Sequence, residues 1–272
     1  DGLGSDVRTL VSHDCVPGED VTTVLDGATL VATQQRLAGR KGAAVVINPG
    51  TNEILAMVSS PSFDPDAFER NDGAALAVIT ANPDGPLANR ATEGLYSAGS
   101  TFKLFTGSAA FVYGGYSTGD TIYCGATWTR VDPPRANWEG AQGPLTIAQG
   151  LMRSCNPVFY EIGLHLYDTD NDLSKMARQY GFGEPTGVEG IYEEGGLVPD
   201  AAWKSRVRGE PWYPGDDVNL AIGQGALLIT PLQLANAYST FLARELRTPV
   251  LLAGAEATLR GEIPLTDQQW SH

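Results

Sequence analysis

Basic residues are scarce in this 272-residue chain, and lysine is the scarcer of the two main types. Lys and Arg together number 18 against 32 Asp and Glu, which gives a formal net charge of −14. A surface of that sign repels phosphate groups, so we expect no nucleic acid among the partners of the chain. Lysine occurs only at positions 41, 103, 175 and 204, which makes any lysine beside a nucleophile noticeable.

Cysteine is equally rare. Cys15, Cys124 and Cys155 are an odd number, so we predict no complete disulfide framework and interpret Cys155 as a small buried side chain. Apart from His13, which lies close to Cys15, the histidines lack the spacing to cysteine or carboxylate that is typical of a metal site. We therefore expect no metal and no other cofactor.

Long hydrophobic runs are also missing. No apolar stretch approaches the roughly 20 residues that cross a bilayer, and no signal peptide is recognisable. With 42% hydrophobic and 18% charged residues, the composition is that of an ordinary globular protein. A chain of this length can bury a sizeable core in one large domain or two modest ones.

Apolar runs and turn residues predict an α+β protein. Residues 43–47 and 54–58 are apolar and flank the turn sequence Asn-Pro-Gly-Thr-Asn, which predicts a β-hairpin over residues 43–60. Helical spacing predicts helices over residues 29–37, 101–113, 145–152 and 157–166, and a last one that begins at Pro231. We interpret residues 115–143 as a loop, residues 1–22 as an irregular segment and residues 23–272 as one domain.

Ser100 and Lys103 place a hydroxyl and an amine on one helical face, because residues three apart are neighbours on a helix. Gly99 permits a sharp turn before that helix, and the free N–H groups of the first turn favour a developing negative charge. A neighbouring base activates a serine hydroxyl, and a partly desolvated lysine can be neutral enough to act as that base. The Ser-x-x-Lys spacing is typical of acyl-serine enzymes.

A structural interpretation competes with the chemical one. Ser100 could cap a helix whose lysine is solvated, and Ser154 and Asn156 could be a helix-end serine and a capping asparagine. Each pattern taken alone leaves that interpretation open, so the surrounding sequence has to decide between them.

Several tracts, in order along the chain, resemble the transpeptidase domain of penicillin-binding proteins. Residues 96–103, Tyr-x-x-Gly-Ser-Thr-Phe-Lys, resemble the first catalytic motif of that family, and Ser154-Cys155-Asn156 resembles the second motif, Ser-x-Asn. Outside these motifs, the similar tracts are residues 44–49, 53–57, 60–65, 180–187, 212–216, 221–225 and 230–235. The Ile-Gly-Gln-Gly form of residues 222–225 is most similar to monofunctional, class B enzymes of the cell-elongation type. The resemblance implies an antiparallel sheet flanked by helices, with a helical subdomain.

The third motif of the family, Lys-Thr-Gly or Lys-Ser-Gly, does not occur in the chain. Residues 261–270 resemble family sequence that lies shortly before this motif, so we expect the chain to stop before it, with the C-terminal strands missing. In the family, the strand that carries this third motif supplies one of two oxyanion-hole donors. Losing one such donor typically lowers the rate by about 10²–10³-fold. We therefore expect this chain by itself to be acylated slowly or not at all.

The resemblance implies a peptidoglycan D,D-transpeptidase that forms a serine acyl-enzyme with D-Ala–D-Ala stem peptides and is acylated by β-lactams. Ser100 would be the nucleophile and Lys103 its base, Ser154 would relay a proton, and Asn156 would hold Lys103 and the substrate amide. The implied location is the extracytoplasmic face of the bacterial cell membrane, with the anchor outside this chain. For an elongation-type member the implied partner is a membrane glycosyltransferase of the SEDS class.

Two other functions remain open at the level of sequence. A serine β-lactamase shares the Ser-x-x-Lys and Ser-x-Asn patterns, but it needs a placed deacylation base, and none of the glutamates stands in a recognisable context. A catalytically impaired sensor or scaffold would explain the missing third motif, whereas it has no need of Ser100, Lys103, Ser154 and Asn156. We interpret Trp138 and Trp212 as packing aromatics that could otherwise line the cleft.

Overall fold

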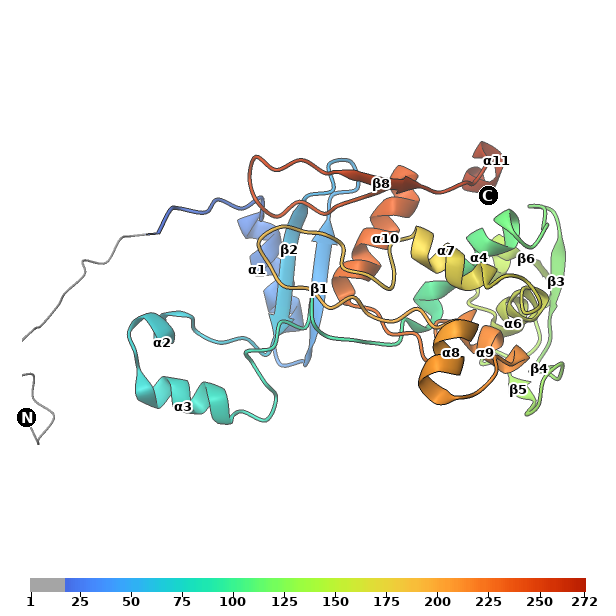
Figure 1. The fold of residues 1–272 in the computed structure, drawn as a ribbon, viewed down its shortest axis with the longest axis horizontal. Coiled ribbons are helices and arrows are strands. Elements are labelled where there is room, and N and C mark those ends of the chain that lie inside the picture. Colours follow the sequence, from blue (N-terminus) through green and yellow to red (C-terminus); the bar gives the residue numbers. More distant parts are fainter. Residues whose placement is uncertain (1–17) are drawn as a thin grey trace, which may run out of the picture.

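A β-hairpin between two helices forms one end of the molecule. A computed structural model describes residues 18–272, in which β1 (Gly42–Ile47) pairs antiparallel with β2 (Ile54–Ser60). Helix α1 (Gly27–Leu37) packs on both strands, and α10 (Pro231–Ala243) packs on β1 on the side of the hairpin opposite α1 (Figure 1). The near-continuous apolar character of the two strands follows from this cover on both faces.

The hairpin turn is tied to α10 by a buried asparagine. Asn52 has a φ of 60°, a left-handed conformation that asparagine tolerates. Its amide nitrogen donates to Asn236 Oδ1 at 3.0 Å and to the Arg247 carbonyl at 3.1 Å. Its side-chain oxygen accepts a bond of 2.6 Å from Ser239 Oγ. Asn52 therefore does more than permit the turn, because it also joins the hairpin to the helix that covers it.

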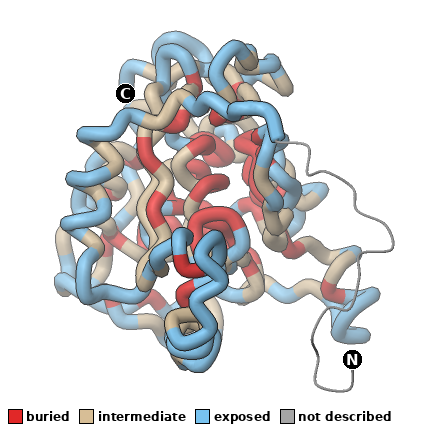
Figure 2. Tube along the Cα trace, turned by 90° about the vertical axis from the view of Figure 1, so that its left-hand side faces the viewer, coloured by how far each residue is buried: buried red, intermediate tan, exposed pale blue. Residues whose placement is uncertain are grey.

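The other end of the molecule is mainly helical and holds the main core. Its elements are η1 (Gly99–Phe102), α4 (Lys103–Val112), α5 (Ile147–Met152), α6 (Asn156–His165), α7 (Asp172–Gln179), α8 (Ala201–Arg208) and α9 (Pro214–Leu220). Helix α4 contacts α5, α6 and α7, and its Phe105 lies among the rings of Phe102, Tyr180, Phe182 and Tyr238. The largest cluster of buried side chains lies in this packing, and in Figure 2 buried segments run through the interior while exposed ones lie around the outside.

Short elements complete the described part of the chain. Helices α2 (Asp66–Glu69) and α3 (Gly73–Ala81) form an arm that extends away from the hairpin (Figure 1). Strand β3 (Thr121–Cys124) pairs with β6 (Gly143–Thr146), β4 (Thr127–Trp128) with β5 (Arg135–Ala136), and β7 (Glu245–Arg247) with β8 (Leu259–Glu262), all antiparallel. Helix α11 (Asp267–Ser271) follows, and no helix within residues 18–272 is long and apolar enough to cross a membrane.

The structure confirms the predicted hairpin and the predicted helices, and it corrects the interpretation of residues 115–143. That stretch contains the strands β3, β4 and β5 and the first residue of β6, which are only two to four residues long and pair with one another. For the predicted irregular segment, only residues 18–22 are described, and they form neither helix nor strand. His13 and Cys15 lie outside the described residues, and the boundary of the predicted domain at residue 23 stays a prediction.

The interpretation of Cys155 as a small buried side chain without a further role is wrong, because Cys124 and Cys155 form a disulfide. An odd number of cysteines excludes complete pairing but not one bond. The bond joins β3 to the residue that precedes α6, so Cys155 is a cross-link and not a small filler.

Removing this disulfide is expected to lower the free energy of unfolding by about 2–4 kcal/mol, because an open loop gains freedom in the unfolded chain. The bond closes a loop of sequence separation 31. Urea unfolding of wild type and of the double variant Cys124→Ala/Cys155→Ala measures the difference. Equal unfolding midpoints and slopes would show that the bond contributes nothing to stability.

Candidate active site

Ser100 lies exposed on a tight turn that leads into the central helix. Gly99, with a φ of 57°, begins the 3₁₀ turn η1, and α4 continues from Lys103. Ser100 therefore precedes the α-helix by one 3₁₀ turn, and in a 3₁₀ turn residues three apart are eclipsed. This places the side chains of Ser100 and Lys103 along the same side of the turn, as their spacing predicts.

Lys103 is fully buried, and its amine is held by the turn that links α5 and α6. Lys103 Nζ donates to the Ser154 carbonyl at 2.8 Å, to Ser154 Oγ at 3.0 Å and to Asn156 Oδ1 at 2.6 Å. The amine also lies 5.4 Å from the centre of the Phe159 ring. The structure thus brings three of the four residues singled out in the sequence, Lys103, Ser154 and Asn156, into direct contact, with Ser100 one turn from Lys103.

Burial changes the acid–base behaviour of this lysine. Removal from water disfavours the charged amine and lowers the pKa of Lys103 from 10.5 to about 8. At pH 7 about one molecule in ten then carries a neutral Lys103, against about one in 3,000 for an unperturbed lysine. A buried lysine of this kind can accept a proton from a neighbouring hydroxyl.

Each residue of the Ser154–Asn156 turn is bonded to the segment of residues 121–138, which runs from β3 to just after β5. The indole N–H of Trp138 donates to the Ser154 carbonyl at 3.2 Å, and Cys155 is bonded to Cys124. The backbone N–H of Asn156 donates to Asn137 Oδ1 at 3.3 Å. Ser154 itself has a φ of 52°, so the turn needs such fastening to hold an unfavourable backbone conformation.

Trp138 and Trp212 differ, although the sequence suggests packing for both. Trp138 is 67% exposed beside the Lys103 amine, so packing does not explain it. Trp212 packs against the main core and donates its indole N–H to Asp217 Oδ2 at 2.6 Å. Burial raises the pKa of Asp217 to about 7, against the lowering effect of that hydrogen bond.

The Ile-Gly-Gln-Gly tract supports the Ser100 turn from behind. The Gly99 N–H donates to the Gly223 carbonyl at 2.9 Å. A Cβ added to Gly223 would lie 2.3 Å from the Gly99 carbonyl oxygen and 2.7 Å from its nitrogen, so only glycine fits there. Asn137, Trp138 and Gly223 are thus part of the site, although sequence reasoning assigned them no chemistry. The family likeness of residues 221–225 drew attention to Gly223, Trp138 was considered as an aromatic that could line the cleft, and Asn137 was missed.

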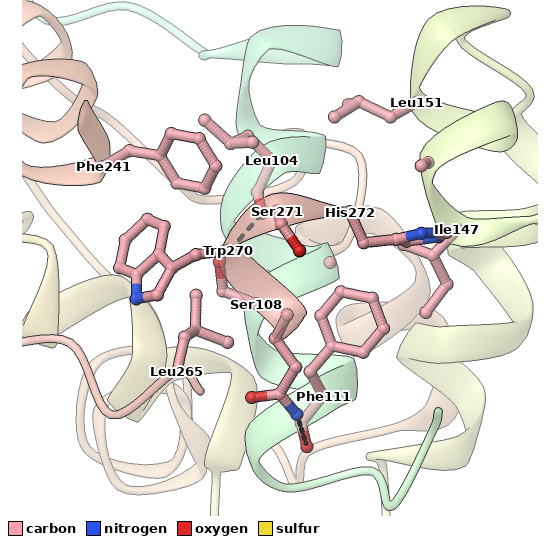
Figure 3. Close-up of a pocket in the computed structure, with 13 residues that line it drawn as sticks. Leu104, Ser108, Phe111, Ile147, Leu151, Phe241, Leu265, Trp270, Ser271 and His272 are labelled. Atoms are coloured by element: carbon pink, nitrogen blue, oxygen red, sulfur yellow. Dashed lines mark hydrogen bonds between the residues drawn. The ribbon is translucent and has the colours of Figure 1, made fainter. Parts of the chain in front are cut away.

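An apolar cavity of about 320 Å³ lies beside α4, between α4, α5, α10 and α11 (Figure 3). Leu104, Phe111, Phe241 and Trp270 are among its walls. The cavity contains none of the four candidate residues, so the acid–base chemistry lies outside it. Within residues 18–272, no group of three His, Cys, Asp or Glu side chains is arranged to hold a metal ion.

Comparison with known sequences places this chain in a family. The family model described as "Penicillin binding protein transpeptidase domain" matches residues 42–271. The peptidoglycan D,D-transpeptidase MrdA of Acinetobacter baumannii is 35% identical over 243 residues, which cover 85% of this chain and 35% of that protein. The chain therefore spans about a third of the length of this curated relative.

Solved structures are similar over most of the chain. A chain in a structure described as structural coordination of polymerization and crosslinking by a peptidoglycan synthase complex matches with a TM-score of 0.83 at 32% identity. The match covers 99% of this chain and 51% of that one. Penicillin-binding protein A of Mycobacterium tuberculosis, in its penicillin G acyl-enzyme complex, matches with a TM-score of 0.72 at 26% identity, over 92% of this chain and 61% of that one.

Proposed function

This chain belongs to the penicillin-binding protein transpeptidase family, and on that premise we propose that it carries the acyl-serine site of a peptidoglycan D,D-transpeptidase of the elongation type. The observation that carries the proposal is the buried amine of Lys103, which contacts both Ser154 and Asn156 and lies one 3₁₀ turn from the exposed Ser100. A scaffold has no need of a lysine that is buried in this way.

In the proposed reaction, Ser100 Oγ attacks the carbonyl carbon of the penultimate D-alanine of a stem peptide while its proton passes to Lys103 Nζ. The C–N bond to the terminal D-alanine breaks, and Ser154 Oγ relays a proton to the departing amine. Asn156 holds Lys103 through its Oδ1 and would hold the substrate amide through its NH₂ group. An amine from a neighbouring stem peptide then takes the acyl group and restores Ser100. A β-lactam enters the same first step and leaves a persistent ester.

The proposed location is the extracytoplasmic face of the bacterial membrane, where peptidoglycan is made. The proposed partner of the parent protein is a membrane glycosyltransferase of the SEDS class. Support comes from the similarity to a chain from a peptidoglycan synthase complex and to an MrdA enzyme.

The first test is acylation of the full-length gene product by excess benzylpenicillin, followed by intact mass over several hours. We expect a lasting mass gain of one benzylpenicillin per protein in wild type and none in Ser100→Ala. In the 272-residue chain alone we expect acylation about 10²–10³-fold slower, because it lacks a Lys-Thr-Gly tripeptide.

Other outcomes separate the competing functions. Steady release of hydrolysed penicillin with little retained adduct would indicate a β-lactamase. An unmodified full-length protein would overturn the transpeptidase proposal and favour a scaffold. An adduct that persists in Ser100→Ala would place the nucleophile elsewhere.

A further inference from the structure

Trp138 is exposed to solvent yet held in a defined place. Its side chain is 67% exposed, and its indole N–H points at the Ser154 carbonyl. The preceding residue, Asn137, is buried, and it donates from its backbone to Ala126 at 2.8 Å and from its amide to Gly140 at 2.6 Å. The backbone that carries the indole is therefore fixed, although the ring itself buries little surface.

The hydrogen bonds of Lys103 fit its charged form. An ammonium has three N–H donors, and Lys103 Nζ has three acceptors: the carbonyl and Oγ of Ser154 and Oδ1 of Asn156. A neutral amine has two N–H donors and one lone pair. To take the proton of Ser100 the lone pair must face Ser100, so one of the three acceptors must lose its donor.

The three acceptors differ in whether another donor remains when Lys103 withdraws its N–H. The Ser154 carbonyl also accepts from Trp138 Nε1 at 3.2 Å, so it stays paired when Lys103 leaves it. Among the hydrogen bonds of residues 18–272, Lys103 is the donor to Ser154 Oγ and to Asn156 Oδ1, with no second donor. Leaving a partly buried acceptor unpaired is costly, so the carbonyl is the acceptor that Lys103 can release at least cost.

From this geometry we propose that Trp138 is a positioning residue for Lys103: its indole N–H takes over the Ser154 carbonyl and thereby frees the lysine amine to turn toward Ser100. The inference rests on the proposed function, since it assumes that Lys103 is the base for Ser100. It predicts that without the indole N–H the Ser154 carbonyl has Lys103 as its remaining donor. The ammonium form of Lys103, which has a third N–H for that carbonyl, is then favoured.

Most ionisable groups on the elements packed against α4 have local partners. The elements packed against it carry Arg153 after α5, Tyr160, Glu161 and His165 on α6, Asp172, Lys175 and Arg178 on α7, and Glu139 beside Trp138. Glu161 binds Trp128 and Arg130, Glu139 binds Gln142, Lys175 binds Asp172, and Arg178 binds Asp200. Burial is the cause of the lowered pKa of Lys103, so a change at Trp138 is not masked by a strong charge nearby.

The test is the pH profile of benzylpenicillin acylation, from pH 6 to pH 10, for the full-length gene product and its Trp138→Phe and Trp138→Ala variants. Losing one hydrogen bond to the carbonyl is expected to move the acid limb of the profile upward by about 0.4–1 pH unit. Both variants should therefore react about 2.5- to 10-fold more slowly than wild type at pH 7. The rates should converge as the pH approaches about 10, where most of Lys103 is neutral in all three proteins.

Tyr123→Phe is the matched control, because Tyr123 is 66% exposed on β3 and its variant loses one polar atom from an aromatic side chain. It should follow the wild-type profile. A Trp138→Phe rate equal to wild type at every pH, or lower by one constant factor at every pH, would overturn the positioning role while the proposed function stands. A wild-type protein that is not acylated at any pH would overturn both.

Discussion

Replacing Lys103 with methionine is expected to lower the rate of benzylpenicillin acylation by about 10²–10⁴-fold, the usual contribution of a general base. Methionine is similar in length and fills the buried site, but it has no amine to take the proton of Ser100. The side chain of Lys103 is fully buried, so no other group can enter the same position. Stopped-flow or gel-based rates with a fluorescent penicillin, compared with wild type at pH 7.5, measure the loss.

The pH dependence of stability is also expected to change in Lys103→Met. Because the pKa of Lys103 is about 8 when folded and 10.5 as a free side chain, the unfolded chain binds more protons between these values. The lysine therefore costs stability below pH 8, and that cost disappears as the pH rises through 10.5. Lys103→Met removes this pH-dependent cost, so its free energy of unfolding should rise less between about pH 7 and pH 10 than that of wild type.

Lys175→Met is the matched control, because Lys175 is a partly exposed lysine that pairs with Asp170 and Asp172. It should change neither the acylation rate nor its pH dependence. If Lys103→Met kept a tenth or more of the wild-type rate, Lys103 would not be the base.

Local sequence signals were sufficient for the larger elements of the fold. The hairpin over residues 43–60 and the helix from Pro231 follow from apolar runs, turn residues and a proline at a first helical position, and the structure contains both. The α+β transpeptidase fold implied by the resemblance is confirmed by the similar solved structures. Strands β4 and β5 escaped prediction because two-residue strands have no periodicity and exist only through their pairing with each other.

The contacts among distant residues could not be predicted. Cys124 and Cys155 are separated by 31 positions, and only the fold decides which two of three cysteines meet. Trp138 looks like any packing aromatic in sequence, since its exposure and the direction of its indole N–H depend on the buried Asn137 before it. Spacing placed Ser100 beside Lys103, and the resemblance implied the contact of Lys103 with Asn156, which the structure contains. The contact of Lys103 with Ser154 is visible only in the structure.

Gly223→Ala is expected to lower benzylpenicillin acylation by about 10²-fold or more, although residue 223 touches no reacting atom. An added Cβ would lie 2.3 Å from the Gly99 oxygen and 2.7 Å from Phe102 Cβ, and neither neighbour is a flexible side-chain end. The turn that carries Ser100 must therefore move, and a displacement of about 1 Å at a nucleophile can cost about 10²-fold in rate. Acylation rates of the full-length gene product and its variant measure the effect.

Gly209→Ala separates displacement of the turn from ordinary backbone strain. Gly209 has a φ of 69°, nearly the 68° of Gly223, but a Cβ there meets no atom within 4 Å. Both substitutions place alanine in the left-handed region and should cost similar stability for that reason, about 1–2 kcal/mol. Only Gly223→Ala also pushes on Gly99, so only it should lose acylation. Equal acylation rates in the two variants would mean that the Gly99–Gly223 contact does not position Ser100.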